Sequence, residues 1–163
     1  MQTSEEDVRR LLTAIGDDPT RPGLIETPAR VVKANAEIFA HTGETTFTDY
    51  KLFEVATDTD MVVVADIPFY SMCEHHLLPF FGTVTVAYQP KQQVIGLSKI
   101  PRLVDWAARR PSVQEGLTTL IADELSRIVS AEGVAVHISA RHMCMEMRGI
   151  NPVSYTHLTL PTN

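Results

Sequence analysis

Hydrophobic positions in the first 45 residues recur with the period of a helix. In VRRLLTAIG, which begins at Val8, the apolar side chains lie three or four residues apart and end at a glycine, which predicts an amphipathic helix. Ser4 and Asp7 stand at the positions of a capping box before this helix. A second helix is predicted from Thr27, because Pro28 is favoured in the first turn. Residues 1–45 are therefore predicted to form a helical N-terminal segment.

Beyond residue 50 the period changes to that of strands. The segments KLFEV, MVVVADI and GTVTVAYQP are typical strands, and MVVVADI is apolar enough to predict burial on both faces. A short helix is predicted from Pro101. A longer helix is predicted from Ser112, with a Ser112–Glu115 capping box at its start and Gly133 as its stop. VAVHISA and MCMEMRGI then predict a hairpin that turns near Arg141.

Together these elements predict a single α+β domain over residues 1–150, in which an antiparallel sheet has helices packed on one side. The last segment, residues 151–163, contains VSYTHLTLPTN, which shows no periodicity. It resembles the translation of a sequencing-adapter sequence joined to a truncated gene, and we expect it to be a non-native tail. Loss of the natural continuation would leave a sheet edge unpaired, which favours aggregation.

Composition limits the kinds of partner. Of the 163 residues, 44% are hydrophobic and 21% are charged, which is ordinary for a globular domain. The net charge of −6 argues against nucleic-acid binding, although clustered Arg and Lys can still hold a small anion. No apolar run approaches the roughly 20 residues that span a bilayer, and the acidic start MQTSEEDVRR is unlike a signal peptide. The sequence therefore predicts a cytoplasmic protein that binds no membrane.

The segment SMCEHHLLPFFG places a thiol, a carboxylate and two imidazoles in consecutive residues. Cys73 and His76 have the C-x-x-H spacing with which one turn presents two ligands to one ion. His142 and Cys144 are two residues apart, so they share a face if their segment is a strand. The chain has two cysteines and both belong to these clusters, and thiolates with imidazole are a typical zinc set.

These clusters hold more ligands than a catalytic zinc needs. Three protein ligands leave a fourth position for water, so two of Cys73, His75, His76, His142 and Cys144 are left over. The spacing does not say which two. A remaining histidine is suited to carry protons beside an activated water. The alternative is that the cysteines are ordinary buried residues and the histidines are hydrogen-bonded polar groups without a metal.

Several cationic residues suit an anionic ligand. Ser98, Lys99 and Arg102 stand at a predicted helix start, where backbone N–H groups favour phosphate; solvated surface charges are the alternative. Arg30 and Lys33 lie one turn apart on the second predicted helix, where a solvated face is the simplest interpretation.

Four blocks carry a resemblance to a known family: PTRPGLIETPARV, SMCEHHLLPFFGTVTVAYQP, VIGLSKIPRLVDWAARRPSVQEGLT and ARHMCMEMRGI. In this order they resemble the signature blocks of GTP cyclohydrolase I, over the chain from about Val8 to Ile150. The resemblance implies the tunnelling fold, in which subunits contribute antiparallel sheet to a barrel in a homodecamer. It also implies conversion of GTP and water to 7,8-dihydroneopterin triphosphate and formate, the first step of folate and pterin biosynthesis.

The resemblance further implies a role for each matching residue. Cys73, His76 and Cys144 match the ligands of Zn2+, and His75 and His142 match the catalytic histidines. The substrate contacts that match are Glu115 and Gln114 for guanine, Ser98, Lys99, Arg102 and Arg148 for the triphosphate, and Arg30 and Lys33 for the triphosphate of a neighbouring subunit.

Three alternative functions remain open. The first is a non-catalytic, zinc-stabilised oligomeric module of the same fold. The second is an inactive truncated fragment, and the third is a member of the reductase branch of the tunnelling fold. In that branch a cysteine attacks a nitrile and NADPH is used, and the C-x-x-H and H-x-C pair argues against it because such chemistry needs no zinc. Unfolding on zinc removal would indicate the structural module.

Overall fold

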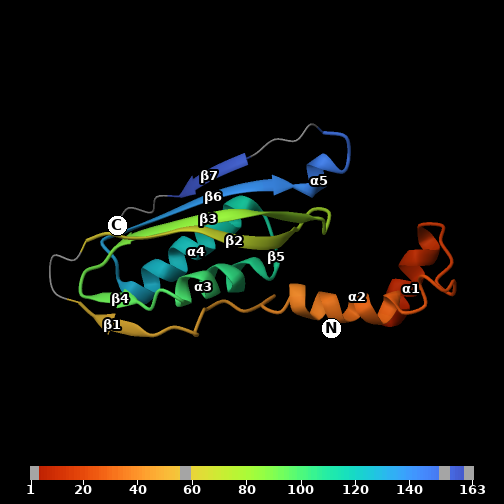
Figure 1. The fold of residues 1–163 in the computed structure, drawn as a ribbon, viewed down its shortest axis with the longest axis horizontal. Helices are drawn as coiled ribbons and strands as arrows, with labels where there is room; N and C mark the ends of the chain where they lie inside the picture. Colours follow the sequence, from red (N-terminus) through yellow and green to blue (C-terminus); the bar gives the residue numbers. More distant parts are fainter. Residues whose placement is uncertain (1–3, 56–59, 151–154, 160–163) are drawn as a thin grey trace. The chain divides into compact units, whose positions relative to one another are not determined.

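The two helical patterns of the N-terminal segment form α1 (Glu5–Ala14) and α2 (Thr27–Ile38), drawn in red and orange in Figure 1. The computed structural model describes residues 4–55, 60–150 and 155–159. The predicted capping box is confirmed, because the Asp7 N–H donates to Ser4 Oγ at 3.2 Å and the Ser4 N–H donates to Asp7 Oδ2 at 3.1 Å. These helices belong to one compact unit, Met1–Ala40, and the rest of the chain forms a second, His41–Asn163. A single domain over residues 1–150 stays a prediction.

A five-stranded sheet organises the second unit, with the order β5-β2-β3-β6-β7 (Figure 1). Its strands are β2 (Val62–Cys73), β3 (Pro79–Gln89), β5 (Pro111–Ser112), β6 (Gly133–His142) and β7 (Tyr155–Thr159). All neighbours are antiparallel except β5, which pairs with β2 in parallel. A separate pair is formed by β1 (Leu52–Glu54) and β4 (Gln93–Ile95). The helices are α3 (Lys99–Ala108), α4 (Gln114–Val129) and the short α5 (Met143–Glu146).

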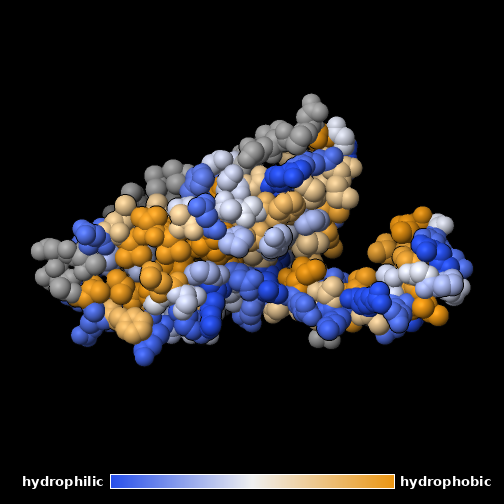
Figure 2. All heavy atoms as spheres, viewed as in Figure 1, coloured by the Kyte–Doolittle hydropathy of each residue, from blue (hydrophilic) through white to orange (hydrophobic). Residues whose placement is uncertain are grey.

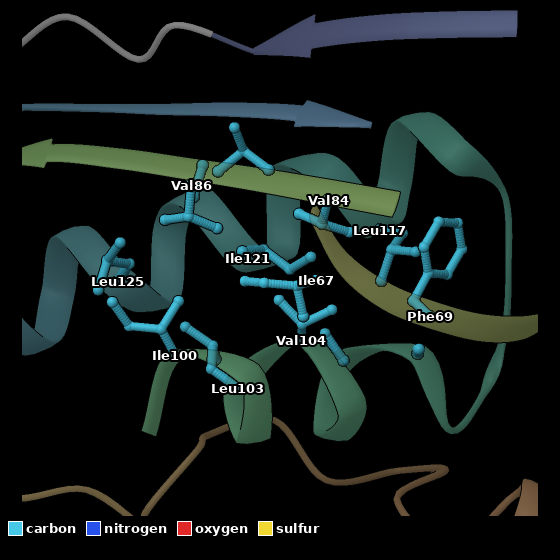
Figure 3. Close-up of a cluster of buried hydrophobic side chains, with 14 of the residues drawn as sticks. Ile67, Phe69, Val84, Val86, Ile100, Leu103, Val104, Leu117, Ile121 and Leu125 are labelled. Atoms are coloured by element: carbon cyan, nitrogen blue, oxygen red, sulfur yellow. The ribbon is translucent and has the colours of Figure 1, made fainter. Parts of the chain in front are cut away.

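The hydrophobic core lies between the sheet and the helices α3 and α4, which pack on β2 and β6 as well as on each other. Figure 3 shows side chains of β2 and β3, among them Phe69 and Val84, meeting Val104 of α3 and Ile121 of α4. Three of these four, Val84, Val104 and Ile121, are completely buried. The mixed helix and sheet content and the helices on one side of the sheet agree with the fold predicted from the sequence.

Close packing of β3 against β6 depends on a glycine. A Cβ atom built on Gly82 would lie 1.9 Å from the Ser139 backbone oxygen, so no side chain fits there without displacing β6. Gly82 and Ala140 are paired neighbours in the register that also brings Phe80 opposite His142. This strand pairing positions the end of β6 beside the start of β3.

Two predictions for strands are wrong. The MVVVADI segment does not bury both faces: burial alternates along β2, with the Val63 side chain 51% exposed and Phe69 buried, as an antiparallel sheet with one covered face requires. The second strand of the predicted hairpin is absent, because MCME forms α5 directly after β6. Sequence periodicity cannot separate a strand from a helix in so short an apolar run.

The end of α4 and the sheet edge also differ from the predictions. The helix ends at Val129 and Ser130 adopts the left-handed conformation with φ of 47°, so Gly133 opens β6 and does not stop the helix. β6 is not left unpaired, because β7 pairs with it from Val136 to Ala140. The non-native origin of residues 151–163 stays a prediction. Among the described residues, no helix combines the length and the apolar character needed to cross a bilayer.

Candidate metal centre and catalytic cleft

The turn between β2 and β3 forms the first half of the site. The Leu77 N–H donates to the Cys73 carbonyl at 2.8 Å, and the Cys73 N–H donates to the Leu78 carbonyl at 2.9 Å. Leu77 has a φ of 50°, in the left-handed region that non-glycine residues rarely adopt. Closing the chain in this way folds the three polar residues after Cys73 back on the strand end, and His76 reaches the same space as the Cys73 thiol.

The second half of the site stands at the junction of β6 and α5. His142 is the last residue of β6 and Cys144 the second residue of α5. The predicted strand, on which both would share a face, is therefore wrong, yet both side chains line the same cleft as Cys73. The first turn of α5, in place of the predicted strand, brings the side chains of His142 and Cys144 to the same cleft.

Three side chains form a group that can hold a metal ion. The sulfur atoms of Cys73 and Cys144 and a ring nitrogen of His76 all lie within 4.8 Å of one another. Ligands of one tetrahedral zinc stand roughly 3.5 to 4 Å apart, so the group needs only a small contraction to bind it. The two thiols are buried and the imidazole is exposed. Two sulfurs and one nitrogen fit zinc by their chemistry and leave one coordination position open.

Burial raises the pKa of the Cys144 thiol, and the neighbouring Cys73 sulfur raises it further. Two thiolates side by side in a buried position repel each other, so they are favoured only when a cation neutralises them. A coordinating divalent metal deprotonates such thiols outright. The pair is therefore suited to a bound cation.

His75 lies at the open side of this group. Its Nδ1 is 3.9 Å from the Cys73 sulfur and its Nε2 is 3.9 Å from a Glu74 carboxylate oxygen, and the side chain is exposed. The ring lies edge-on to that of His76, with centroids 6.3 Å apart. His75 is thus adjacent to the metal group without belonging to it, as the resemblance implied for a proton carrier.

His142 lies deeper in the cleft. Its ring stacks on Phe80 with centroids 5.2 Å apart and planes inclined by 3°, and its Nε2 is 2.7 Å from Gln114 Oε1. Burial lowers the pKa of His142, which the negative charges of Glu115 and Glu146 partly oppose. The ring is held between a strand and a helix and favours the neutral form.

The cleft has a volume of about 290 Å³. It collects eight of the residues singled out in the sequence: Cys73, His75, His76, Gln114, Glu115, His142, Cys144 and Arg148. Sequence reasoning missed five further lining residues: Phe80, Ser112, Val113, Met145 and Ile150. The only sequence signal for Phe80 was its place in the apolar run after the histidines, which is equally typical of a core residue.

The capping interpretation of Glu115 is wrong. The residue before α4 is Val113, which makes no side-chain cap, and Ser112 Oγ donates to the Val113 carbonyl at 3.1 Å. Ser112 instead belongs to β5, opposite Cys73, and its carbonyl accepts from the Glu74 N–H at 3.0 Å. Glu115 is therefore exposed at the cleft with no capping role that would explain it.

One predicted phosphate contact lies in the cleft. Arg148 Nη1 donates to His76 Nε2 at 2.7 Å, so this cation stands next to the metal group.

The other predicted phosphate contacts lie elsewhere. None of Ser98, Lys99 and Arg102 is among the described residues that line the cleft. Lys99 and Arg102 both pair with the Asp49 carboxylate, Arg102 at 2.7 Å. Their hydrogen bonds, that of Lys99 first, lower the pKa of Asp49. They lie near the start of α3, at the end of the sheet opposite the β2–β3 turn (Figure 1).

Arg30 and Lys33 belong to α2 in the first unit, where Arg30 pairs with Glu26.

A cleft that unites a thiol–imidazole group able to hold a metal with two further histidines, built on a mostly antiparallel sheet, is typical of a metalloenzyme. The model of the GTP cyclohydrolase I family matches residues 4–162. The chain therefore belongs to the GTP cyclohydrolase I family.

The relatives are similar over most of their length. GTP cyclohydrolase 1 of Lactiplantibacillus plantarum is 62% identical over 148 residues, which cover 90% of this chain and 78% of the relative. GTP cyclohydrolase 1 of Latilactobacillus sakei is 59% identical over 162 residues, covering 97% and 86%. The enzyme of Campylobacter lari is 50% identical over 159 residues, covering 95% and 82%.

A solved structure, the archaeosine synthase QueF-Like in the apo form, has a similar fold. Its TM-score is 0.54 at 16% identity, and the match covers 66% of this chain and 98% of that one. At this identity the likeness extends to the fold alone.

Proposed function

We propose that the chain hydrolyses and rearranges GTP to 7,8-dihydroneopterin triphosphate and formate in the cytoplasm, as the entry step of folate and pterin biosynthesis. Membership of the GTP cyclohydrolase I family supports the activity on GTP. The observation that carries the proposal is that Cys73, His76 and Cys144 share one cleft with two histidines outside the metal group, His75 and His142.

The metal proposed for this group is zinc, held by Cys73, His76 and Cys144. When bound, zinc lowers the pKa of a coordinated water so that hydroxide is accessible near neutral pH. Hydrolysis begins with addition of water across the C8–N7 double bond of guanine, so that C8 gains the oxygen and N7 a proton. The C8–N9 bond then breaks, N9 takes up the hydroxyl proton, and the formyl group stays on N7 until the second hydrolysis. His142 is proposed to protonate N7, because it is the more enclosed histidine and is held in one orientation by Phe80.

Later steps also require proton transfer. A second hydrolysis releases formate, and the ribose then opens, rearranges and closes onto the freed amine. His75, exposed at the mouth of the metal group, is placed to exchange protons with solvent during these steps. The two histidines thus differ in burial, which suits them to different steps.

Base selection is proposed to fall to Glu115. Its carboxylate stands in the cleft without a capping role and can accept hydrogen bonds from the N–H donors of guanine. A base without these N–H donors would bury the Glu115 carboxylate and leave it unpaired, so the site would discriminate strongly against that base.

The triphosphate is proposed to lie across the boundary between subunits of a homodecamer. Arg148 is the predicted phosphate contact that the chain places in its own cleft, whereas Lys99 and Arg102 are held by Asp49 at the other end of the sheet. A second copy can bring these two cations, with Ser98, to the cleft, and Arg30 and Lys33 can come from a further copy. Figure 2 shows apolar residues, in orange, over a broad part of the second unit, which supports a role of this surface in assembly.

The direct test is incubation of the purified chain with GTP and stoichiometric zinc, followed by measurement of formate and pterin. We expect both products with zinc and neither after chelation, while far-UV circular dichroism shows that the fold is kept. Unfolding on chelation would instead support the zinc-stabilised module, and absence of both products from a folded, zinc-loaded chain would refute the activity.

A further inference from the structure

Gln114 joins α4 to the end of β6 through both ends of its side-chain amide. The residue is 1% exposed and is the first of α4. Its Nε2 donates to the Ile138 carbonyl at 3.0 Å, and its Oε1 lies 2.7 Å from His142 Nε2. The amide thus spans from the middle of the strand to the histidine at its end.

The orientation of this amide follows from its partners. A backbone carbonyl only accepts hydrogen bonds, so the amide nitrogen must face Ile138 and the amide oxygen must face His142. An amide oxygen also only accepts, and His142 Nε2 must therefore carry a hydrogen. In a neutral imidazole one nitrogen is protonated, so the lone pair of His142 is then on Nδ1.

Phe80 restrains the plane of the His142 imidazole ring. The two rings are nearly parallel at 5.2 Å, and Phe80 is itself fully buried opposite His142 in the β3–β6 register. The stacking contact with Phe80 and the hydrogen bond to Gln114 together restrain the plane of the imidazole and its rotation within that plane.

We propose that Gln114 is a positioning residue, which holds His142 as the Nε2–H tautomer, so that Nδ1 first takes up a proton from the attacking water and then gives it to N7. The resemblance implied a contact with guanine for Gln114, whereas here both ends of its amide are engaged within the chain. The inference rests on the proposed function in one respect only, the role of His142 as a proton carrier.

The tautomer is tested first, by magic-angle-spinning NMR of the full-length, zinc-loaded chain with 15N-labelled histidine. At about pH 8, above the ordinary histidine pKa of about 6.5, the His142 signals are assigned by their loss in His142→Asn. We expect a protonated Nε2 and an unprotonated Nδ1. An Nδ1–H tautomer in the unmodified chain overturns the inference, whether or not the chain acts on GTP, so this outcome is separate from a failure of the proposed function.

The second test compares Gln114→Met, which keeps the size of the side chain but removes both hydrogen bonds, with Thr118→Val. Thr118 is a matched control because it is fully buried on the same helix and its hydroxyl donates to the Gln114 backbone carbonyl at 2.7 Å, whereas His142 faces the Gln114 side-chain amide. In Gln114→Met we expect mixed His142 tautomers and a kcat lowered about 10- to 100-fold, with the KM for GTP changed less than about threefold.

Thr118→Val is expected to keep the tautomer and kcat. A raised KM with unchanged kcat in Gln114→Met would make Gln114 a substrate contact, and an equal loss of kcat in Thr118→Val would make the effect one of packing; either result overturns the positioning role. If Gln114→Met does not fold, the tautomer of the unmodified chain decides alone.

Discussion

Two groups of polar residues lie at opposite ends of the same sheet, and they differ in the partners that their side chains have within the chain. At the β2–β3 turn, thiols, imidazoles and Arg148 from two separate segments, residues 73–76 and 142–148, line one cleft. At the start of α3, Lys99 and Arg102 are paired with Asp49. In the first group, side chains able to bind a metal face one another, whereas in the second group two cations share one carboxylate of the same chain.

A single chain can place the residues of the metal group, but it does not bring the cations at the start of α3 to the same cleft. The metal group needs ligands within a few ångströms of one ion, and two local turns and one strand pairing supply that placement. A triphosphate is long and flexible, so its cations can come from another copy without such tight placement. Metal binding should accordingly be a property of the chain, while full substrate binding should depend on assembly.

The largest expected effect is that of Cys144→Ala, which removes one of two thiolates from the cleft. We expect bound zinc, measured by atomic emission, to fall from about one per chain to background, together with formate production. Met147→Ala is the control, because Met147 lies three residues away, is 66% exposed and is not among the described residues lining the cleft. Stoichiometric zinc in Cys144→Ala would refute the ligand set.

A mixing experiment tests the separation of the two groups. His142→Ala should keep zinc but lower formate production about 100- to 10,000-fold, because it removes a proton carrier. Lys99→Ala should instead weaken GTP binding. If one site combines these residues from two copies, co-assembling the two variants in equal amounts should restore about a quarter of the wild-type activity.

Two controls make the mixing experiment decisive. Each variant assembled with itself should stay at its own low activity, and mixing without co-assembly should restore nothing. Failure to recover activity in mixed assemblies whose composition is confirmed by native mass spectrometry would place Lys99 and His142 in the same site of one copy or remove Lys99 from the site.

Glu115→Ala should separate substrate selection from helix stability. Because α4 has no side-chain cap, we expect the free energy of unfolding to change by less than about 0.5 kcal/mol. The kcat/KM for GTP should fall about 100-fold or more, since guanine loses its partner. Denaturant unfolding and steady-state kinetics measure the two quantities. A large loss of stability with intact kinetics would restore a structural role for Glu115.

The smallest expected effect concerns Asp49. Hydrogen bonds from Lys99 and Arg102 hold its pKa below the ordinary value of 3.8 in the folded chain. A carboxyl with a lowered folded pKa adds stability above its unfolded pKa and loses that contribution as the pH falls through the folded pKa. Asp49→Asn should therefore lower stability slightly at neutral pH, and the difference should shrink below pH 3.8. An equal difference in denaturant unfolding at both pH values would argue against this pair.

Two capping patterns in the chain show how far local reasoning reaches. Ser4 with Asp7 forms the predicted capping box, through contacts that lie within one turn of the chain. Ser112 with Glu115 has the same spacing but forms none, because Ser112 pairs with Cys73 of a strand nearly forty residues away in sequence and the helix starts after it. A tertiary contact thus overrides a local preference worth about 1 kcal/mol.

The residue types and spacings were enough to predict the chemistry of the metal group and the family, because thiols and imidazoles at short spacings restrict the metal and the signature blocks restrict the fold. They also determined the Cys73–His76 half of the metal group, because one tight turn joins them. Three features depend on how the chain folds in space: Cys144 reaches that turn from a helix, Gln114 contacts His142, and Lys99 pairs with Asp49. Those contacts join residues far apart in the chain, and no local period records which strand or carboxylate will lie opposite.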